Sequence, residues 1–300
     1  MDSDLDKLDI GKVLSPLLDV VFKFLFTKKE LGICLRSLLS SLLGRDSAAV
    51  KILSNELPVD DVSQINERHD IICLLDGEIL VDLEIEAFRK TGMSDDNLLP
   101  RILYYLDRLY TNQNIKGRQY KFLLKAYHIT IFNFSVLDSI IGYKEKFLYK
   151  GEISNLIKTE HNSFIIIDMT NLSDAVKKPV KNMTSLEMWL VFLKYANDPQ
   201  YRSIINQIDL AKGEIKMAHQ ALLDLSQDDR ERARLLSISK FQMDYDSHVS
   251  AEIELAEKRG AEQATQKSQH EIIAHMRSEG LDDEKIAKLS GLPMDIVKTA

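Results

Sequence analysis

The sequence predicts an α/β fold, a mixed sheet flanked by helices, followed by an all-helical C-terminal region. Apolar runs that alternate with the two-residue period of strands lie before residue 170, and a segment with helical periodicity separates two of them. The dipeptide Asp76-Gly77 stands between two such runs, which is a strong local signal for a β-hairpin. From Ser185 onward, apolar residues recur at helical spacing instead.

The N-terminal elements follow from caps and turn residues. Ser15 is suited to cap a helix that has Pro16 at its first position, and a second helix over 30–43 is expected to end near Gly44. A helix over 98–115 precedes a strand, so a crossover that returns the chain to the same sheet is expected. Strands are predicted at 50–53, on both sides of the turn in the hairpin 64–88, and at 125–134, 147–150 and 163–168.

The remaining sequence predicts helices whose apolar content decreases toward the C-terminus. Helices are expected over 185–193 and 204–225, and a capping-box pattern at 226–229 begins a long polar helix that passes residue 255. Gly280 ends that helix, and two short helices around Gly291 resemble a helix-turn-helix. Residues 226–300 hold 11 Lys and Arg against 15 Asp and Glu, which disfavours a DNA-reading arm and favours packing or oligomerisation. The predicted division is 1–170, 171–249 and 250–300.

The composition is that of a globular protein, with 45% hydrophobic and 28% charged residues. A net charge of −7 argues against a protein that coats polyanions, but a nuclease with a local basic groove remains compatible with it. Cys34 and Cys73 form no metal or redox motif and are expected to be reduced and buried. The acidic N-terminus lacks a signal-peptide pattern, and no apolar run reaches the length of a membrane span, so a cytoplasmic protein without a membrane partner is expected.

Acidic residues follow the second strand of the predicted hairpin. Asp82, Glu84 and Glu86 alternate with apolar residues, so their side chains are expected on one face of the strand. In a tight hairpin, paired residue numbers sum to about 153, which brings Asp70 of the first strand beside Glu84. Two interpretations stay open: a solvated acidic face, or a site where a hard divalent cation such as Mg²⁺ or Mn²⁺ offsets the repulsion between the carboxylates.

Two further groups of charged residues have alternative explanations. Asp19 and Lys23 are four residues apart on the first helix and form either a surface ion pair or a group that faces the acidic strands. Arg101, with Tyr104 and Tyr105, belongs either to the core edge and solvated face of its helix or to a surface that contacts phosphates.

Several of these segments resemble one protein family. They are 14–26 with Asp19 and Phe22-Lys23, the hairpin 68–86, the helix with Arg101 followed by Gly117, and the closing residues 280–292. Together they are similar to the PD-(D/E)XK nuclease family transposases, also called recombination-promoting nucleases. The resemblance covers most of the chain and is strongest over 14–135.

The resemblance implies a restriction-endonuclease-like sheet in residues 1–170 and Mg²⁺-dependent cleavage of DNA, with Mn²⁺ as the alternative ion. Asp70 would match the first metal-binding acid and Glu84 the second. Glu86 occupies the position of a Gln or Lys, and a shift of the assignment to Asp82 and Glu84 would not restore a Lys. Accessory roles would fall to Asp19 and Lys23, and DNA contacts to Arg101, Lys116, Arg118 and Lys121.

Glu86 separates the functional hypotheses. A Lys there would stabilise the charged transition state, whereas a Glu adds negative charge near a phosphodiester. Either Glu86 is a further metal ligand or general base in a DNA endonuclease associated with recombination or transposition, or the protein is a catalytically weakened member. The weakened member would bind DNA or form homo-oligomers through its C-terminal helices. A third hypothesis is an unrelated scaffold with a solvated acidic face.

Overall fold

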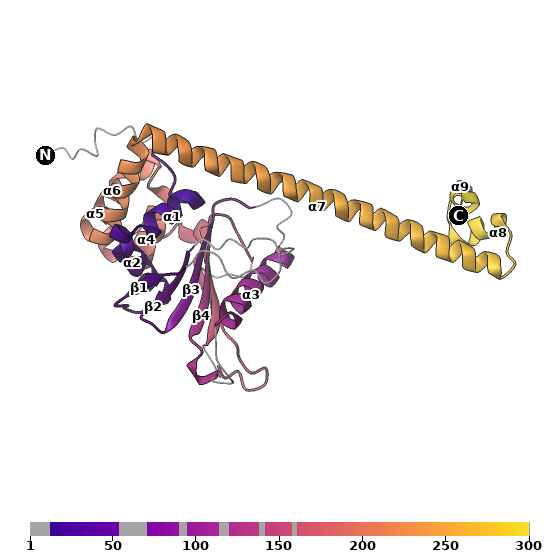
Figure 1. The fold of residues 1–300 in the computed structure, drawn as a ribbon, viewed down its shortest axis with the longest axis horizontal. Helices are drawn as coiled ribbons and strands as arrows, with labels where there is room; N and C mark the ends of the chain where they lie inside the picture. Colours follow the sequence, from indigo (N-terminus) through magenta and orange to yellow (C-terminus); the bar gives the residue numbers. More distant parts are fainter. Residues whose placement is uncertain are drawn as a thin grey trace. The chain divides into compact units, whose positions relative to one another are not determined.

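The computed structural model describes residues 13–53, 71–89, 95–113, 120–137, 142–157 and 161–299, with the backbone alone at 95 and over 241–254. Within these residues, six strands form one mixed sheet in the order β1-β2-β3-β4-β6-β5. Figure 1 labels the first four of these strands. The central strands β3, β4 and β6 are parallel, and the other pairings are antiparallel. The strands are β1 (Val50–Ile52), β2 (Ile71–Leu75), β3 (Ile79–Glu86), β4 (Lys125–Phe132), β5 (Lys144–Phe147) and β6 (Asn162–Asp168).

The predicted hairpin is confirmed as β2 and β3. Asp76 and Gly77 both have positive φ, 52° and 73°, which is the backbone that a tight turn between two twisted strands requires. Ile71 pairs with Leu83, so paired residue numbers sum to 154, close to the expected 153. Asp70 lies just before the described part of β2 and outside the described residues.

The predicted crossover is also confirmed. The helix α3 (Asp95–Thr111) connects β3 to β4, and these strands pair in parallel with Glu84 opposite Thr130. The apolar stripe of α3 packs on one face of the sheet (Figure 1). This stripe contains Leu98, Ile102, Leu106 and Leu109.

The main core lies on the other face of the sheet, under five helices (Figure 1). Odd-numbered residues of the strands, such as Leu83 and Ile129, join Phe22, Trp189 and Phe192 in this core. The predicted fold class, a mixed sheet flanked by helices with further helices toward the C-terminus, is therefore confirmed. The five helices are α1 (Asp19–Thr27), α2 (Gly32–Leu43), α4 (Ser185–Tyr195), α5 (Arg202–Ala211) and α6 (Gly213–Gln227).

Two predicted boundaries were wrong. The first helix begins at Asp19 rather than Pro16, because Leu18 has an extended backbone and the Leu18 N–H closes a turn on the Ser15 carbonyl. The strand expected at 147–150 lies at 144–147 as β5, where it pairs with β6 from Ile167 to Phe164.

The long helix α7 (Asp229–Ser278) passes residue 255 as predicted, but its cap differs from the prediction. The Asp228 carboxylate accepts the N–H groups of Arg230 and Glu231, which makes Asp228 the N-terminal cap. The Ser226 hydroxyl accepts the Leu14 N–H instead and therefore links the N-terminal segment to α6.

The chain divides into two compact units, one that ends at Gln242 and a C-terminal unit that begins at Met243. In the C-terminal unit, the predicted short helices on either side of Gly291 are confirmed as α8 (Asp283–Ser290) and α9 (Met294–Thr299). Ile273, Ile286 and Val297 form their small core. The division predicted at 170 and 250 stays a prediction. None of the described helices combines the length and apolar character that a membrane span requires.

Candidate active site

The three acids of β3 lie on the face that α3 covers. Asp82, Glu84 and Glu86 are 0%, 5% and 7% exposed, so the interpretation as a solvated acidic face is wrong. They share one face because successive side chains of a strand point to opposite sides. Buried carboxylates require partners, since an unpaired charge away from water is costly.

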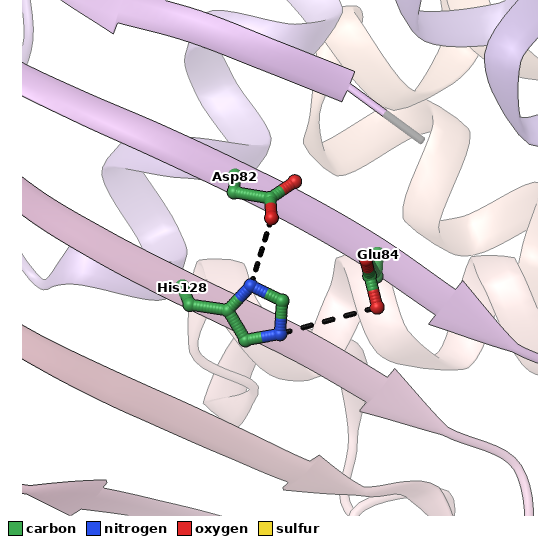
Figure 2. Close-up of side chains that lie close together, drawn as sticks. All are labelled: Asp82, Glu84 and His128. Carbon is green, nitrogen blue, oxygen red and sulfur yellow. Dashed lines mark hydrogen bonds and ion pairs between the residues drawn. The ribbon is translucent and has the colours of Figure 1, made fainter. Parts of the chain in front are cut away.

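The neighbouring strand β4 supplies the first partner. The parallel register places His128 opposite Asp82 and Thr130 opposite Glu84. The Nδ1 atom of His128 lies 2.9 Å from Asp82 Oδ2, and its Nε2 atom lies 3.0 Å from the Thr130 hydroxyl and 3.9 Å from Glu84 Oε2. Figure 2 shows the ring between the two carboxylates. The ring of Tyr105 from α3 stacks on His128 at a centroid distance of 5.9 Å.

Asp82, Glu84 and His128 form a donor set that fits a divalent cation. One ligand atom from each lies within 4.8 Å of the others. Two carboxylate oxygens suit Mg²⁺ or Mn²⁺, and an imidazole nitrogen is a ligand of transition metals. Burial raises the pKa of Glu84, and the neighbouring Asp82 and Glu86 raise it further against the lowering effects of His128 and Arg101. A cation between the carboxylates would relieve this repulsion.

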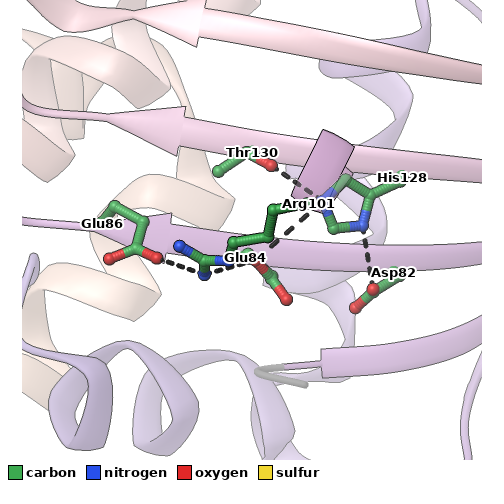
Figure 3. A network of polar contacts seen from close by, with 6 residues as sticks. All are labelled: Asp82, Glu84, Glu86, Arg101, His128 and Thr130. Carbon is green, nitrogen blue, oxygen red and sulfur yellow. Dashed lines mark hydrogen bonds and ion pairs between the residues drawn. The ribbon is translucent and has the colours of Figure 1, made fainter. Parts of the chain in front are cut away.

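The helix α3 supplies a second partner for the buried acids. The Arg101 Nη2 atom donates to Glu86 Oε1 at 2.6 Å and lies 3.6 Å from Glu84 Oε2 (Figure 3). Burial lowers the pKa of Arg101, but Glu86 and Glu84 outweigh that effect and hold it above its ordinary value, so the guanidinium stays charged. Sequence reasoning proposed a phosphate contact for Arg101, which stays a prediction, and gave no indication of its contact with the acids.

The other predicted site residues are more dispersed. Asp19 and Lys23 form an ion pair of 3.0 Å on α1, whose buried residues belong to the core on the opposite face of the sheet from the acids. Lys121 is exposed in a short 3₁₀ helix, where its Nζ lies 5.0 Å from the Phe122 ring centroid. Asp70, Lys116 and Arg118 lie outside the described residues. The roles proposed for these residues stay predictions.

Sequence reasoning missed His128. The signal was present, because His128 and Thr130 alternate with apolar residues in the strand predicted at 125–134. Their approach to Asp82 and Glu84 depends on the register between β3 and β4. These strands are joined by a crossover rather than by a tight turn, so no local turn signal indicates their register.

The mixed sheet, with its acidic strand and crossover helix, is consistent with the PD-(D/E)XK nuclease fold. A family model described as PD-(D/E)XK nuclease family transposase matches residues 16–252, and the chain therefore belongs to this family. This agrees with the resemblance seen in the sequence. No curated protein and no solved structure matches the chain.

Proposed function

We propose that this protein is a divalent-metal-dependent DNA endonuclease that acts in recombination or transposition. The observation that carries the proposal is the buried group Asp82, Glu84 and His128 on adjacent parallel strands, in a chain of a nuclease family. Asp70 precedes β2, which pairs with β3, and the sequence resemblance proposes it as the first metal-binding acid. Mg²⁺ is the proposed ion, with Mn²⁺ as the alternative. DNA is the proposed partner, and the cytoplasm is the proposed location.

The proposed reaction is hydrolysis of a phosphodiester by water. Glu84 would hold the cation together with Asp70 and one or both of Asp82 and His128. The bound cation supplies Lewis-acid polarisation of a phosphate oxygen and lowers the pKa of a bound water. Asp82 fixes the His128 ring through Nδ1, so that Nε2 faces Glu84 and Thr130.

A second candidate is a catalytically weakened family member that binds DNA or associates through its C-terminal helices. The observation that favours it is Glu86, an acid where the family pattern has Gln or Lys. The Glu86 side chain is only 9% exposed, so its negative charge is part of the site rather than of the solvated surface.

Plasmid nicking in Mg²⁺ and in Mn²⁺ tests the proposal. Cleavage by the wild type that Asp70→Ala and Glu84→Ala both abolish supports the endonuclease. The matched control is Asp107→Ala, which removes an exposed acid of α3 and leaves nicking unchanged. A folded wild type that shifts DNA on a gel but cleaves it in neither metal would support the second candidate instead.

A further inference from the structure

Arg101 brings a positive charge to Glu84 and Glu86 on the face of the sheet that α3 covers. We propose that Glu86 holds Arg101 in place rather than binding metal. The positive charge of Arg101 then compensates part of the negative charge of the carboxylate site. This inference rests on the proposed function; it gives Glu86 a role that differs from the one expected from the sequence, and it adds a second role to Arg101.

The geometry joins one guanidinium to two acids. The 2.6 Å contact with Glu86 is a charge-assisted hydrogen bond, and Glu84 lies within ion-pair distance at 3.6 Å. Figure 3 shows Arg101 between these carboxylates. A Glu86 carboxylate that holds Arg101 this closely has part of its negative charge compensated, so it is a weaker candidate for a further cation ligand.

Glu86 and Arg101 differ in the exposure of their side chains. The Glu86 side chain is 9% exposed, whereas the Arg101 side chain is 30% exposed, so part of Arg101 reaches solvent while Glu86 is buried. Arginine has several N–H donors in a planar fork, and those not used by Glu86 suit a phosphate oxygen. Glu86 therefore holds the Arg101 guanidinium beside the acids, and the pair as a whole carries no net charge.

The helix α3 fixes this cation at the sheet. Arg101 is next to Ile102, which is buried in the packing of α3 on the sheet. Tyr105 lies one turn further along, with its ring centroid 5.6 Å from the Arg101 guanidinium carbon, and it also stacks on His128. The same helix turn thus positions both the cation and the imidazole beside the acids.

The charge of residue 101 should then control the affinity of the site for a divalent cation. Arg101→Met removes the compensating charge and should tighten Mn²⁺ binding about tenfold, because Glu84 and Glu86 lose a positive charge within ion-pair distance. Arg101→Lys keeps the charge and should stay within about threefold of the wild type. The double variant Arg101→Met with Glu86→Gln restores the net charge of the pair and should also return to within about threefold.

The experiment is Mn²⁺ titration of the full chain without DNA, followed by the electron paramagnetic resonance of free Mn²⁺. Lys177→Met is the control for the loss of one positive charge, because Lys177 is exposed and pairs with Asp174 in another part of the chain. Its Mn²⁺ affinity should equal that of the wild type. Urea unfolding of each variant verifies that the fold is retained.

Three results would overturn the inference. Unchanged Mn²⁺ affinity in Arg101→Met would mean that Arg101 does not compensate the site, while the proposed endonuclease could still cleave DNA. A loss of affinity beyond about tenfold in the double variant would identify Glu86 as a metal ligand. A wild type that binds no Mn²⁺ at all would remove both this inference and the metal dependence of the proposed function.

Discussion

Replacing Asp82 by alanine removes the carboxylate that holds the buried His128 ring. Both side chains are at most 1% exposed, and their contact is 2.9 Å long. The Asp82 carboxylate accepts from the His128 Nδ1–H, and the alanine variant leaves this buried N–H without that acceptor. We therefore expect a large loss of stability from a residue in the proposed active site.

The size of the loss follows from this burial. Leaving a buried donor without its acceptor costs about 1–3 kcal/mol. We expect the upper end, about 3 kcal/mol, because the lost acceptor is a carboxylate and both side chains are buried. Asp82→Asn keeps an oxygen that can accept from Nδ1–H, so it should cost only about 1 kcal/mol. Against a typical total of about 5–15 kcal/mol, the alanine variant loses a large fraction of its stability.

Urea unfolding measured through tryptophan fluorescence is the assay. Trp189 is the single tryptophan of the chain, and it is fully buried in the core on the opposite face of the sheet from Asp82. EDTA keeps the site free of metal, so that only the protein contacts are compared. With a slope of about 3 kcal/mol per molar urea, the Asp82→Ala midpoint should fall by about 1 M.

The reasoning fails if Asp82→Ala loses less than about 1 kcal/mol, or if Asp82→Asn costs as much as the alanine variant. Asp107→Ala is the control, because it deletes an exposed acid from α3 and should change stability by no more than about 0.5 kcal/mol.

Three other predictions follow from the same site and core. Burial and the acids beside it raise the pKa of Glu84, so its contribution to stability is full below its unfolded pKa and is lost as pH rises through the folded value. Metal-free Glu84→Gln should therefore exceed the wild type in urea midpoint at pH 8, and a lower midpoint would contradict this. Mn²⁺ at 100 times its Kd should stabilise the wild type by about 2.7 kcal/mol and should stabilise Glu84→Gln less; equal gains would exclude Glu84 as a ligand. Burial raises the pKa of Cys73 to about 12 and that of Cys34 to about 11, so neither thiol should react with Ellman's reagent at pH 8 until urea unfolds the protein. Rapid labelling of the folded chain would show that these thiols are accessible.

The features predicted correctly from the sequence are those that local chemistry determines. Asp76 and Gly77 tolerate positive φ, so the hairpin could be placed without knowledge of the rest of the fold. The alternation of Asp82, Glu84 and Glu86 placed them on one face for the same local reason.

The features that sequence reasoning missed depend on distant segments. Ser15 has the side chain of a helix cap, yet Leu18 is extended and the helix starts three residues later than Pro16. The position of β6 between β4 and β5 requires pairing between segments that no local signal connects. Turn residues and helix periodicity carry no information about pairing between distant strands, so the sheet order could not be predicted.

The candidate site shows the same division. Its acids could be found from one strand, whereas the Arg101 guanidinium comes from α3 and the His128 imidazole from β4. Arg101 reaches Glu86 only because α3 packs on this face of the sheet, and His128 meets Asp82 only because β3 and β4 pair in one register. The composition of the site is therefore a property of tertiary structure.

The buried acids of β3 also have a consequence for folding. A slip of β3 by one residue would turn Asp82, Glu84 and Glu86 toward the apolar core that now contains Leu83 and Ile85. Each unpaired carboxylate there would cost several kcal/mol, far more than a slipped ladder could recover in hydrogen bonds. The residues proposed to cleave DNA thus exclude the nearest misfolded arrangement of the sheet.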